Sequence, residues 1–318
     1  MTHPPQHPNR VAIVGTGLVG ATFGYALVTS GLAAEIVLID ANRSRAEGEA
    51  MDLNHAVPMH HPCRIWAGDY SDCAGADVTV VTAGSAQKPG ETRIDLTQRN
   101  TDILRQIIPQ IAQHNSDGIL LIASNPVDIL TYAAIKLSGF APSQVIGSGT
   151  ILDTARFRYL LSQHFGVDPR SVHGYMIGEH GDSEVPVWSL ANIAGMRLPA
   201  YCNANGLRCE DPILDEITRQ TRDAAYQIIQ RKGATYYAIA SGLLRIVETI
   251  LRNQSTVLTV SSLINDQYGI SDVCLSLPTI IDRGGVERVL RLEYDQKEIA
   301  GLRHSAGILK DLIQKLNL

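Results

Sequence analysis

The glycine-rich segment GTGLVG constrains the fold of this chain more than any other part of its sequence. Gly15, Gly17 and Gly20 directly follow a short apolar run rich in β-branched residues, and they open a helical stretch. The first glycine permits a tight turn, the second lets a pyrophosphate approach the backbone, and the third allows close packing of helix on strand. The helix N-terminus favours the negative charge of a phosphate. The segment therefore predicts a strand–turn–helix unit that binds a dinucleotide.

An aspartate at the end of the second strand-like run narrows the choice of dinucleotide. Asp40 stands twenty residues after Gly20. A carboxylate at this place accepts hydrogen bonds from the ribose hydroxyls of NAD, whereas it repels the 2′-phosphate of NADP. We therefore expect NAD as the cofactor. The alternative is an ordinary glycine turn and a strand-end aspartate without a ligand.

The first half of the chain alternates strand-like and helix-like stretches. Continuous apolar strands separated by helices predict a parallel sheet that is covered on both faces. The fold class expected here is α/β, with a doubly wound Rossmann-type sheet. The six expected strands are 10–15, 35–40, 63–68, 76–84, 118–124 and 144–149.

The second half has a different pattern, which predicts an α+β portion. A helix starts near Thr150, hairpin-like material follows at about 171–190, and a long helical region at about 211–251 contains breaks at Gly233 and Gly242. Three strands and an amphipathic helix complete this half, at 256–264, 272–282, 286–294 and 300–316.

These patterns divide the chain into three parts. We expect a disordered tail at 1–9, an NAD-binding domain at 10–148 and a substrate domain at 149–318. No long linker separates the two domains, so they should pack tightly.

The composition excludes several classes of partner. The net charge of −5 gives no basic surface for nucleic acid and no polybasic patch for a membrane. No apolar run approaches the length that spans a bilayer. The five cysteines are scattered and form no C-x-x-C pair, which favours reduced thiols and a cytoplasmic location. The segment HHPC at 60–63 lacks a second ligand cluster, so we expect no metal site.

The helical segment at 150–161 carries an acid and two arginines. Asp153 and Arg156 are three residues apart, so they lie within about 60° of each other on one helix face. Arg158 falls about 200° from Arg156, on the opposite face. The helix can thus direct an acid and an arginine inward and a second arginine outward. From the spacing alone, the favoured interpretation of Asp153 and Arg156 is a surface ion pair.

Two loops follow strands at the carboxyl edge of the expected sheet, where doubly wound sheets bind ligands. The segment at 83–96 is a polar loop with glycine and proline that contains Arg93, and a lid that carries this arginine is one interpretation. A solvated turn is the other. Asn125 follows the fifth strand, and its bond to Pro126 is a candidate for the cis form, which would rigidify the turn.

A single histidine stands in the segment IGEHGDSEVP. An enzyme that oxidises a hydroxyl by hydride transfer needs a base for the proton, and a bidentate arginine is the best holder for a carboxylate substrate. His180 could be that base, a metal ligand, or a histidine without a special task. The local segment does not choose between these interpretations.

Seven features occur together in a fixed order along this chain. They are GTGLVG, Asp40, QKPGETR, SNPVD, LDTARFR, GEHGDS and KGATYYAIA. With this order and spacing, the chain resembles the lactate/malate dehydrogenase family, and within it the bacterial NAD-dependent L-lactate dehydrogenases. The resemblance covers nearly the whole length beyond the N-terminal tail. It implies reversible hydride transfer between NADH and pyruvate, which gives L-lactate and NAD+.

The resemblance implies a role for each reacting residue. His180 is expected to be the proton donor and acceptor, with Asp153 orienting its ring and stabilising the imidazolium. Arg156 is expected to clamp the substrate carboxylate, and Arg93 to polarise the carbonyl that is reduced. Asn125 is expected to bind near the substrate oxygen and the nicotinamide ribose.

The resemblance also implies further contacts to substrate and cofactor. Thr235 is expected to line the substrate pocket, and Ile239 to pack against the nicotinamide face. The full set of implied cofactor-binding residues is Gly15, Gly17, Leu18, Val19, Gly20, Asp40, Gly84, Asn125 and Ile239.

Gln87 is the position that bears most on the substrate. Similar malate dehydrogenases have an arginine here, which meets the second carboxylate of oxaloacetate. A neutral glutamine leaves that carboxylate unpaired, at a cost on the order of several kcal/mol. Pyruvate presents a methyl group instead, so we expect pyruvate and L-lactate. Malate or another 2-hydroxy acid is the alternative substrate, and a non-catalytic NAD-binding protein is the alternative of another class.

Arg158 and His173 match basic positions that bind fructose 1,6-bisphosphate at a subunit interface in bacterial members of the family. Two-fold related Arg–His pairs would gather donors for the phosphates. The resemblance implies a homotetramer, in which this pair either mediates activation or serves only as interface residues. It also implies a cytoplasmic enzyme of glycolysis and fermentation.

Overall fold

Six parallel strands form the first part of the fold, as the alternation of apolar runs predicts. The computed structural model describes residues 9–85, 90 and 92–316, so the expected tail lies outside the described residues except for Asn9. The strand order β3-β2-β1-β4-β5-β6 is that of a doubly wound nucleotide-binding sheet. The strands are β1 (Arg10–Val14), β2 (Glu35–Ile39), β3 (Arg64–Ala67), β4 (Val78–Val81), β5 (Ile119–Ile122) and β6 (Val145–Gly147). The helices between them are α1 (Leu18–Ser30), α2 (Arg43–Ala56), α3 (Arg93–His114) and α4 (Val127–Ser138).

Alternate residues of the central strand point into two separate cores. Val11 and Ile13 of β1 belong to a core that α1 and α2 cover, whereas Ala12 and Val14 belong to a core that α3 and α4 cover. Successive side chains of a strand point to opposite faces, and both faces of this sheet are buried. The strands therefore have continuous apolar sequences.

The sheet continues into the second half of the chain. Three antiparallel strands extend it beyond β6, in the order β12-β13-β14, and give a mixed sheet of nine strands. The junction is the pairing of Ser261 in β12 with Gly147 in β6. The predicted boundary at residue 148 thus lies within one continuous sheet. These strands are β12 (Thr256–Ile264), β13 (Val273–Asp282) and β14 (Gly285–Val289).

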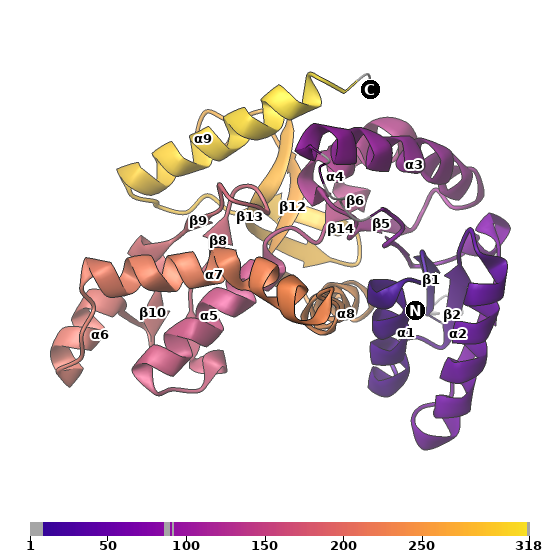
Figure 1. The fold of residues 1–318 in the computed structure, drawn as a ribbon, viewed down its shortest axis with the longest axis horizontal. Coiled ribbons are helices and arrows are strands. Elements are labelled where there is room, and N and C mark those ends of the chain that lie inside the picture. Colours follow the sequence, from indigo (N-terminus) through magenta and orange to yellow (C-terminus); the bar gives the residue numbers. More distant parts are fainter. Residues whose placement is uncertain (1–8, 86–89, 91, 317–318) are drawn as a thin grey trace, which may run out of the picture.

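The rest of the second half consists of helices and short strands. The helices are α5 (Ile151–Phe165), α6 (Leu198–Asn205), α7 (Asp211–Lys232), α8 (Tyr237–Leu251) and α9 (Gln296–Ile313). The short strands are β7 (Val172–His173), β8 (Met176–Ile177), β9 (Val185–Pro186), β10 (Asn192–Ile193) and β11 (Met196–Arg197). The 3-10 turns are η1 (Val57–Met59), η2 (Tyr70–Cys73), η3 (Pro142–Gln144), η4 (Pro169–Ser171) and η5 (Trp188–Leu190). In Figure 1, α5, α6 and α7 lie on the side away from α1 and α2.

The two glycines of the long helical region behave differently. Gly233 has a φ of 84° and ends α7 in the left-handed conformation, as expected. The expected break at Gly242 is wrong, because α8 runs through it. A Cβ on Gly242 would lie 3.1 Å from the side chain of Ile151, so this glycine permits the close approach of α5. Residues of α8 such as Leu243 join the core beneath α1, and the two halves are packed tightly.

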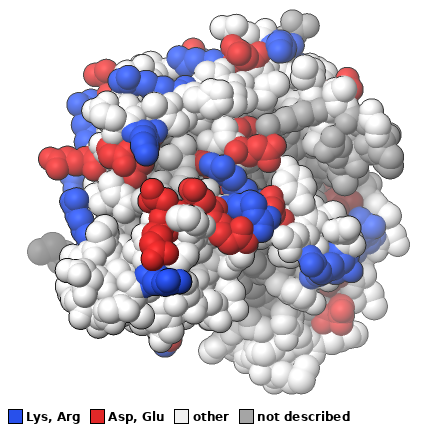
Figure 2. All heavy atoms as spheres, turned by 60° about the vertical axis from the view of Figure 1, so that its left-hand side comes forward, with Lys and Arg blue, Asp and Glu red and all other residues white. Residues whose placement is uncertain are grey.

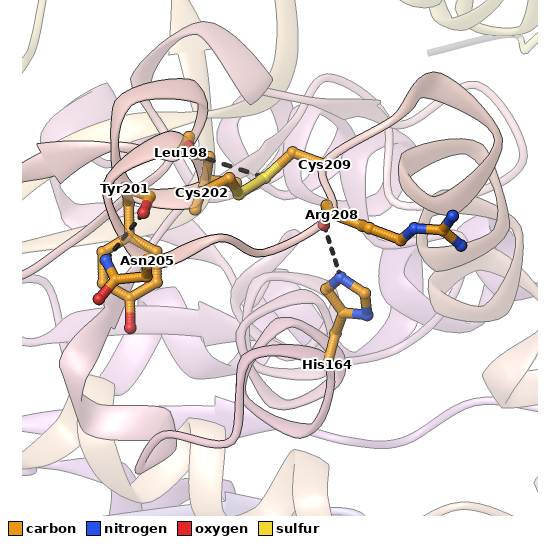
Figure 3. Close-up of a disulfide and its surroundings, with 7 residues drawn as sticks. All are labelled: His164, Leu198, Tyr201, Cys202, Asn205, Arg208 and Cys209. Atoms are coloured by element: carbon orange, nitrogen blue, oxygen red, sulfur yellow. Dashed lines mark hydrogen bonds between the residues drawn. A yellow bond between two sulfur atoms is a disulfide. The ribbon is translucent and has the colours of Figure 1, made fainter.

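The expectation that all five cysteines are reduced is wrong for two of them. Cys202 and Cys209 form a disulfide, with their Cα atoms 6.2 Å apart (Figure 3). Gly206 ends α6 in the left-handed conformation and turns the chain back, which brings the two cysteines within bonding reach although they form no C-x-x-C motif. The free cysteines are Cys63, Cys73 and Cys274.

The surface carries charges of both signs. Figure 2 shows acidic and basic side chains intermingled across the middle of the face that it turns forward. This face therefore lacks the continuous basic surface that binds nucleic acid. Among the described helices, none is long and apolar enough to cross a membrane. Over the same residues, His, Cys, Asp and Glu side chains form no cluster of three that could hold a metal ion.

Candidate active site

His180, Asp153 and Arg156 form one connected group of side chains. The Nδ1 atom of His180 lies 2.5 Å from Oδ2 of Asp153, and Nη1 of Arg156 donates to Oδ1 of the same carboxylate at 2.8 Å. Asp153 and Arg156 lie in the first turns of α5, and His180 follows β8. The Asp153 side chain is only 4% exposed, so the favoured interpretation of a surface ion pair is wrong. The long-range contact to His180 explains why spacing within α5 could not reveal this.

Two further contacts fix the loop that carries His180. The main-chain N–H of His180 donates to Oδ2 of Asp128 at 2.7 Å, and that of Glu179 donates to Oγ of Ser305 at 2.6 Å. Asp128 lies in the first turn of α4 and Ser305 in α9. Two helices that are distant in sequence, α4 and α9, therefore hold the loop, and Asp153 of α5 holds the imidazole itself.

The surroundings of His180 favour its charged form. Burial, the largest single influence, disfavours the imidazolium, but the charge and hydrogen bond of Asp153 outweigh it. Asp153, Asp128 and Glu184 together raise the pKa of His180 from 6.5 to about 9. Burial also acts to raise the pKa of Asp153, yet His180 and Arg156 hold it below its ordinary value. At neutral pH the pair is therefore a His180 imidazolium beside an Asp153 carboxylate. The imidazolium can donate a proton to a substrate.

A cavity of about 400 Å³, which we name the His180 cavity, exposes this group to a ligand. The imidazolium and the Arg156 guanidinium both face it, so it suits a small molecule that carries a carboxylate beside a group that accepts a proton. Its described lining is Leu96, Asn125, Pro126, Asp153, Arg156, His180, Gly181, Asp182, Glu184, Arg222, Ala225, Tyr226 and Ile229.

The glycine turn leaves room for a phosphate at the start of α1. Gly15 has a φ of 101°, and a Cβ on it would lie 2.5 Å from the main-chain nitrogen of Ala83. A Cβ on Gly20 would collide with the carbonyl oxygen of Gly15, whereas a Cβ on Gly17 would meet no atom within 4 Å. No side chain caps the first turn of α1, in which Leu18 and Val19 lie, and this turn has no acidic residue. Open space and uncapped N–H groups fit the pyrophosphate of a dinucleotide.

Asp40 lies beside this turn with its carboxylate well supported. Its oxygens accept hydrogen bonds from the main-chain N–H groups of Thr16 and Asn42, at 2.7 and 2.8 Å. Burial acts to raise the pKa of Asp40, but these hydrogen bonds prevail and hold it below the ordinary value of 3.8. A carboxylate with a lowered pKa at the end of β2 suits ribose hydroxyls and opposes a 2′-phosphate.

The carboxyl ends of β4 and β5 are joined by hydrogen bonds of Asn100. Its side chain donates to the main-chain oxygen of Asn125 at 2.7 Å and accepts from the N–H of Ser85 at 2.8 Å. The Asn125–Pro126 bond is cis, as the sequence suggested, and Asn125 is exposed on the wall of the His180 cavity. Gly84 precedes this junction, and a Cβ on it would touch the side chain of Ser124.

The structure leaves two expected site residues untested and places two others outside the described lining of the His180 cavity. Gln87 lies outside the described residues, and so does the side chain of Arg93, whose backbone begins α3. Thr235 is half-buried between α7 and α8 and is not among the described residues that line the His180 cavity. Ile239 is half-buried in α8 and packs against the core beneath α1.

Arg158 faces away from the His180 cavity, as its helical spacing predicts. Its Nε donates to the main-chain oxygen of Gly174 at 3.0 Å, and it lines a separate cavity of about 580 Å³. His173 is exposed in β7, next to Gly174. Burial lowers the pKa of Arg158, but a guanidinium stays charged at physiological pH.

Comparison with known proteins identifies the family of this chain. Residues 9–147 match the lactate/malate dehydrogenase NAD-binding domain, and residues 150–317 match the α/β C-terminal domain of the same proteins. The chain belongs to the lactate/malate dehydrogenase family. The first match makes its N-terminal part an NAD-binding domain, in agreement with the open glycine turn and Asp40.

Similar relatives include bacterial L-lactate dehydrogenases. The chain is 55% identical over 310 residues to an L-lactate dehydrogenase of Acetivibrio thermocellus, which covers 97% of this chain and 98% of that one. It is 52% identical over 301 residues to an L-lactate dehydrogenase of Priestia megaterium, with 95% and 94% covered. A ligand-bound crystal structure of the minor L-lactate dehydrogenase of Enterococcus mundtii superimposes with a TM-score of 0.95 at 43% identity, covering 98% and 99%.

Three residues that support or line the candidate active site were missed by reasoning from the sequence. Asp128 supports the loop of His180, and Glu184 and Arg222 line its cavity. Asp128 belongs to the segment SNPVD and Glu184 stands four residues after His180, so proximity to the motifs could have drawn attention to them. Arg222 is one of several charged residues of α7, and no local pattern distinguishes it.

Proposed function

We propose that this member of the family reduces pyruvate to L-lactate with NADH and catalyses the reverse reaction. The observation that carries the proposal is the contact of His180, Asp153 and Arg156 in one cavity of a chain that has an NAD-binding domain. The relatives named L-lactate dehydrogenase, matched over nearly the whole chain, support this substrate.

The geometry divides the chemistry between the side chains. Arg156 holds the substrate carboxylate through two parallel hydrogen bonds, while its contact to Asp153 fixes the guanidinium. The imidazolium of His180 gives its proton to the carbonyl oxygen of pyruvate, and Asp153 stabilises the ring in both states. When bound, NADH supplies the hydride for the carbonyl carbon.

The roles of residues at the edge of the cavity are part of the proposal. Arg93 polarises the carbonyl from the start of α3, and Asn125 binds the carbonyl oxygen and the nicotinamide ribose. Thr235 limits the size of the substrate side chain, and Ile239 packs against the nicotinamide. Gln87 favours a methyl group over a second carboxylate.

The test of the function is NADH oxidation with pyruvate and with oxaloacetate. A strong preference for pyruvate supports the assignment to L-lactate and the argument from Gln87. Preference for oxaloacetate contradicts the substrate. Absence of turnover on every 2-oxo acid tried, with NADH still bound, contradicts the catalytic function.

We also propose a cytoplasmic homotetramer of glycolysis and fermentation that fructose 1,6-bisphosphate activates. Support comes from the position of Arg158, which lines a cavity separate from that of Arg156 and donates a hydrogen bond to the main-chain oxygen of Gly174, the residue after His173. The effector should lower the apparent KM for pyruvate, and Arg158→Gln should abolish this response. An unchanged KM in the unaltered tetramer contradicts activation.

The raised pKa of His180 predicts the pH dependence of the reaction. Pyruvate reduction needs the protonated ring, so kcat/KM should stay level from neutral pH to about pH 9 and then fall tenfold per pH unit. Lactate oxidation needs the neutral ring and should rise through the same range. In Asp153→Asn the break should move down toward 6.5, the ordinary value. A break near 6.5 in the unaltered enzyme contradicts the imidazolium–carboxylate pair.

Asp40→Ser is expected to improve the use of NADPH. Removing the carboxylate removes repulsion of the 2′-phosphate, so the ratio of kcat/KM for NADPH to that for NADH should rise by roughly tenfold or more, about 1.4 kcal/mol. Asp117→Ser, at an exposed position before β5, is the matched control and should leave the ratio unchanged. An unchanged ratio in Asp40→Ser contradicts the role given to this carboxylate.

A further inference from the structure

Two charged side chains form a wall between the His180 cavity and a second cavity. The second cavity, which we name the His304 cavity, has a volume of about 560 Å³ and lies between the β9 segment, α7 and α9. Glu184 and Arg222 line both cavities, as does Asp182 at their rim. Asp182 and His304 are exposed, so the His304 cavity reaches the surface.

The wall contains buried polar atoms that lack a partner. Glu184 is only 2% exposed, and its Oε1 accepts no hydrogen bond from the described part of the chain. Arg222 donates from Nη2 to the main-chain oxygen of Glu184 at 2.6 Å, but its buried Nε has no partner among the same residues. Buried polar atoms are usually satisfied, by ordered water where protein groups are lacking. An acceptor and a donor on two residues that are in contact provide partners that such water needs.

The charges around Glu184 are balanced so that its carboxyl retains a proton readily. Burial is the largest influence, and with the negative charge of Asp153 it raises the pKa of Glu184 well above 4.5. The cations His180, Arg222 and Arg156 oppose this rise and prevent it from being larger. At the rim, Asp182 accepts from the hydroxyl of Tyr226 at 2.9 Å, and His304 approaches from α9.

A proton must reach His180 from solvent in every turnover of the proposed reaction. On the substrate side, a molecule held between Arg156 and His180, which both line the His180 cavity, would stand between the imidazole and solvent. The carboxyl of Glu184 interacts electrostatically with His180 on this side and borders the His304 cavity on the other. Glu184 is thus a buried titratable group in the wall that separates the imidazole of His180 from the His304 cavity, which is a second route to the surface.

We propose that Glu184 relays protons between His180 and solvent in the His304 cavity, an inference that rests on the proposed function. After pyruvate has taken the proton of His180, the O–H bond of the Glu184 carboxylic acid breaks and an N–H bond forms on the imidazole through an intervening water. The carboxylate then takes up a proton from bulk solvent, passed along water in the His304 cavity, with Arg222 stabilising its transient charge. No electrons move, and lactate oxidation runs the relay in reverse.

Stopped-flow measurement of proton uptake tests this relay in the tetramer with NADH and pyruvate. NADH absorbance reports the chemical step, and a pH-indicator dye reports proton uptake from solvent. In the unaltered enzyme the two signals should coincide. In Glu184→Gln, which keeps the shape but cannot ionise, proton uptake should lag by roughly tenfold or more with the KM for pyruvate unchanged. Glu216→Gln, an exposed position on α7, is the matched control and should show no lag.

Two further variants separate a relay from a structural role. Ile308→Trp should obstruct the His304 cavity from α9 without entering the His180 cavity, and it should also delay proton uptake. In Glu184→Ala, added formate should restore uptake, because a small acid can occupy the vacated space. If proton uptake coincides with NADH oxidation in either Glu184→Gln or Ile308→Trp, the relay is overturned. An unaltered enzyme that oxidises no NADH with pyruvate overturns the proposed function instead.

Discussion

Replacing His180 with asparagine is expected to lower kcat for pyruvate reduction by roughly 10³- to 10⁴-fold, the range attributed to general acid catalysis. The amide cannot supply the proton that the imidazolium donates, so the carbonyl oxygen must develop negative charge without an acid. Arg156 still binds the carboxylate, and the KM for pyruvate should change far less than kcat. Single-turnover oxidation of enzyme-bound NADH measures the effect on the chemical step.

A matched histidine shows whether the loss is specific. His55→Asn alters an exposed position on α2 and should retain full activity. If His180→Asn retained more than a tenth of the unaltered kcat, another group would have to donate the proton. Equal loss in both variants would point to an effect on folding and not on the reaction.

Arg156→Gln is expected to raise the KM for pyruvate by roughly 10³-fold, about 4 kcal/mol, because the substrate carboxylate loses a bidentate charged partner. Arg156→Lys keeps the charge but not the fork of two donors. Its KM for pyruvate should lie between that of the unaltered enzyme and that of Arg156→Gln. The side chain is 12% exposed, so solvent can replace little of the lost interaction. Steady-state kinetics with pyruvate over a wide concentration range measures this loss.

The Arg156 variants also disturb Asp153, which makes a control necessary. Arg252→Gln removes an exposed guanidinium that pairs with Glu248 at the end of α8 and should leave KM unchanged. The pH profile of Arg156→Gln should keep its upper break, since Asp153 still contacts His180. A normal KM in Arg156→Gln would show that the carboxylate binds elsewhere.

The strands and helices of the first half could be predicted because their signals are local. A strand buried on both faces needs a continuous apolar sequence, and each of the six apolar runs became a strand of the parallel sheet. Local signals failed at Gly242, where a glycine typical of a helix break serves the packing of α5 against α8. They also failed at Cys202 and Cys209, which a turn after α6 brings together.

The sequence by itself determined the order of elements, the glycine turn and the acid at the end of β2, since each depends on residues near in sequence. The spacing within α5 could not show that Asp153 contacts His180, 27 residues away, which the family resemblance alone implied. Only the tertiary structure decided that Arg222 contacts Glu184 across 38 residues. These contacts depend on how α5, α7 and α9 pack, and the pKa of His180 depends on the contacts. Burial and charge at a site arise from packing, and no local pattern of residues contains them.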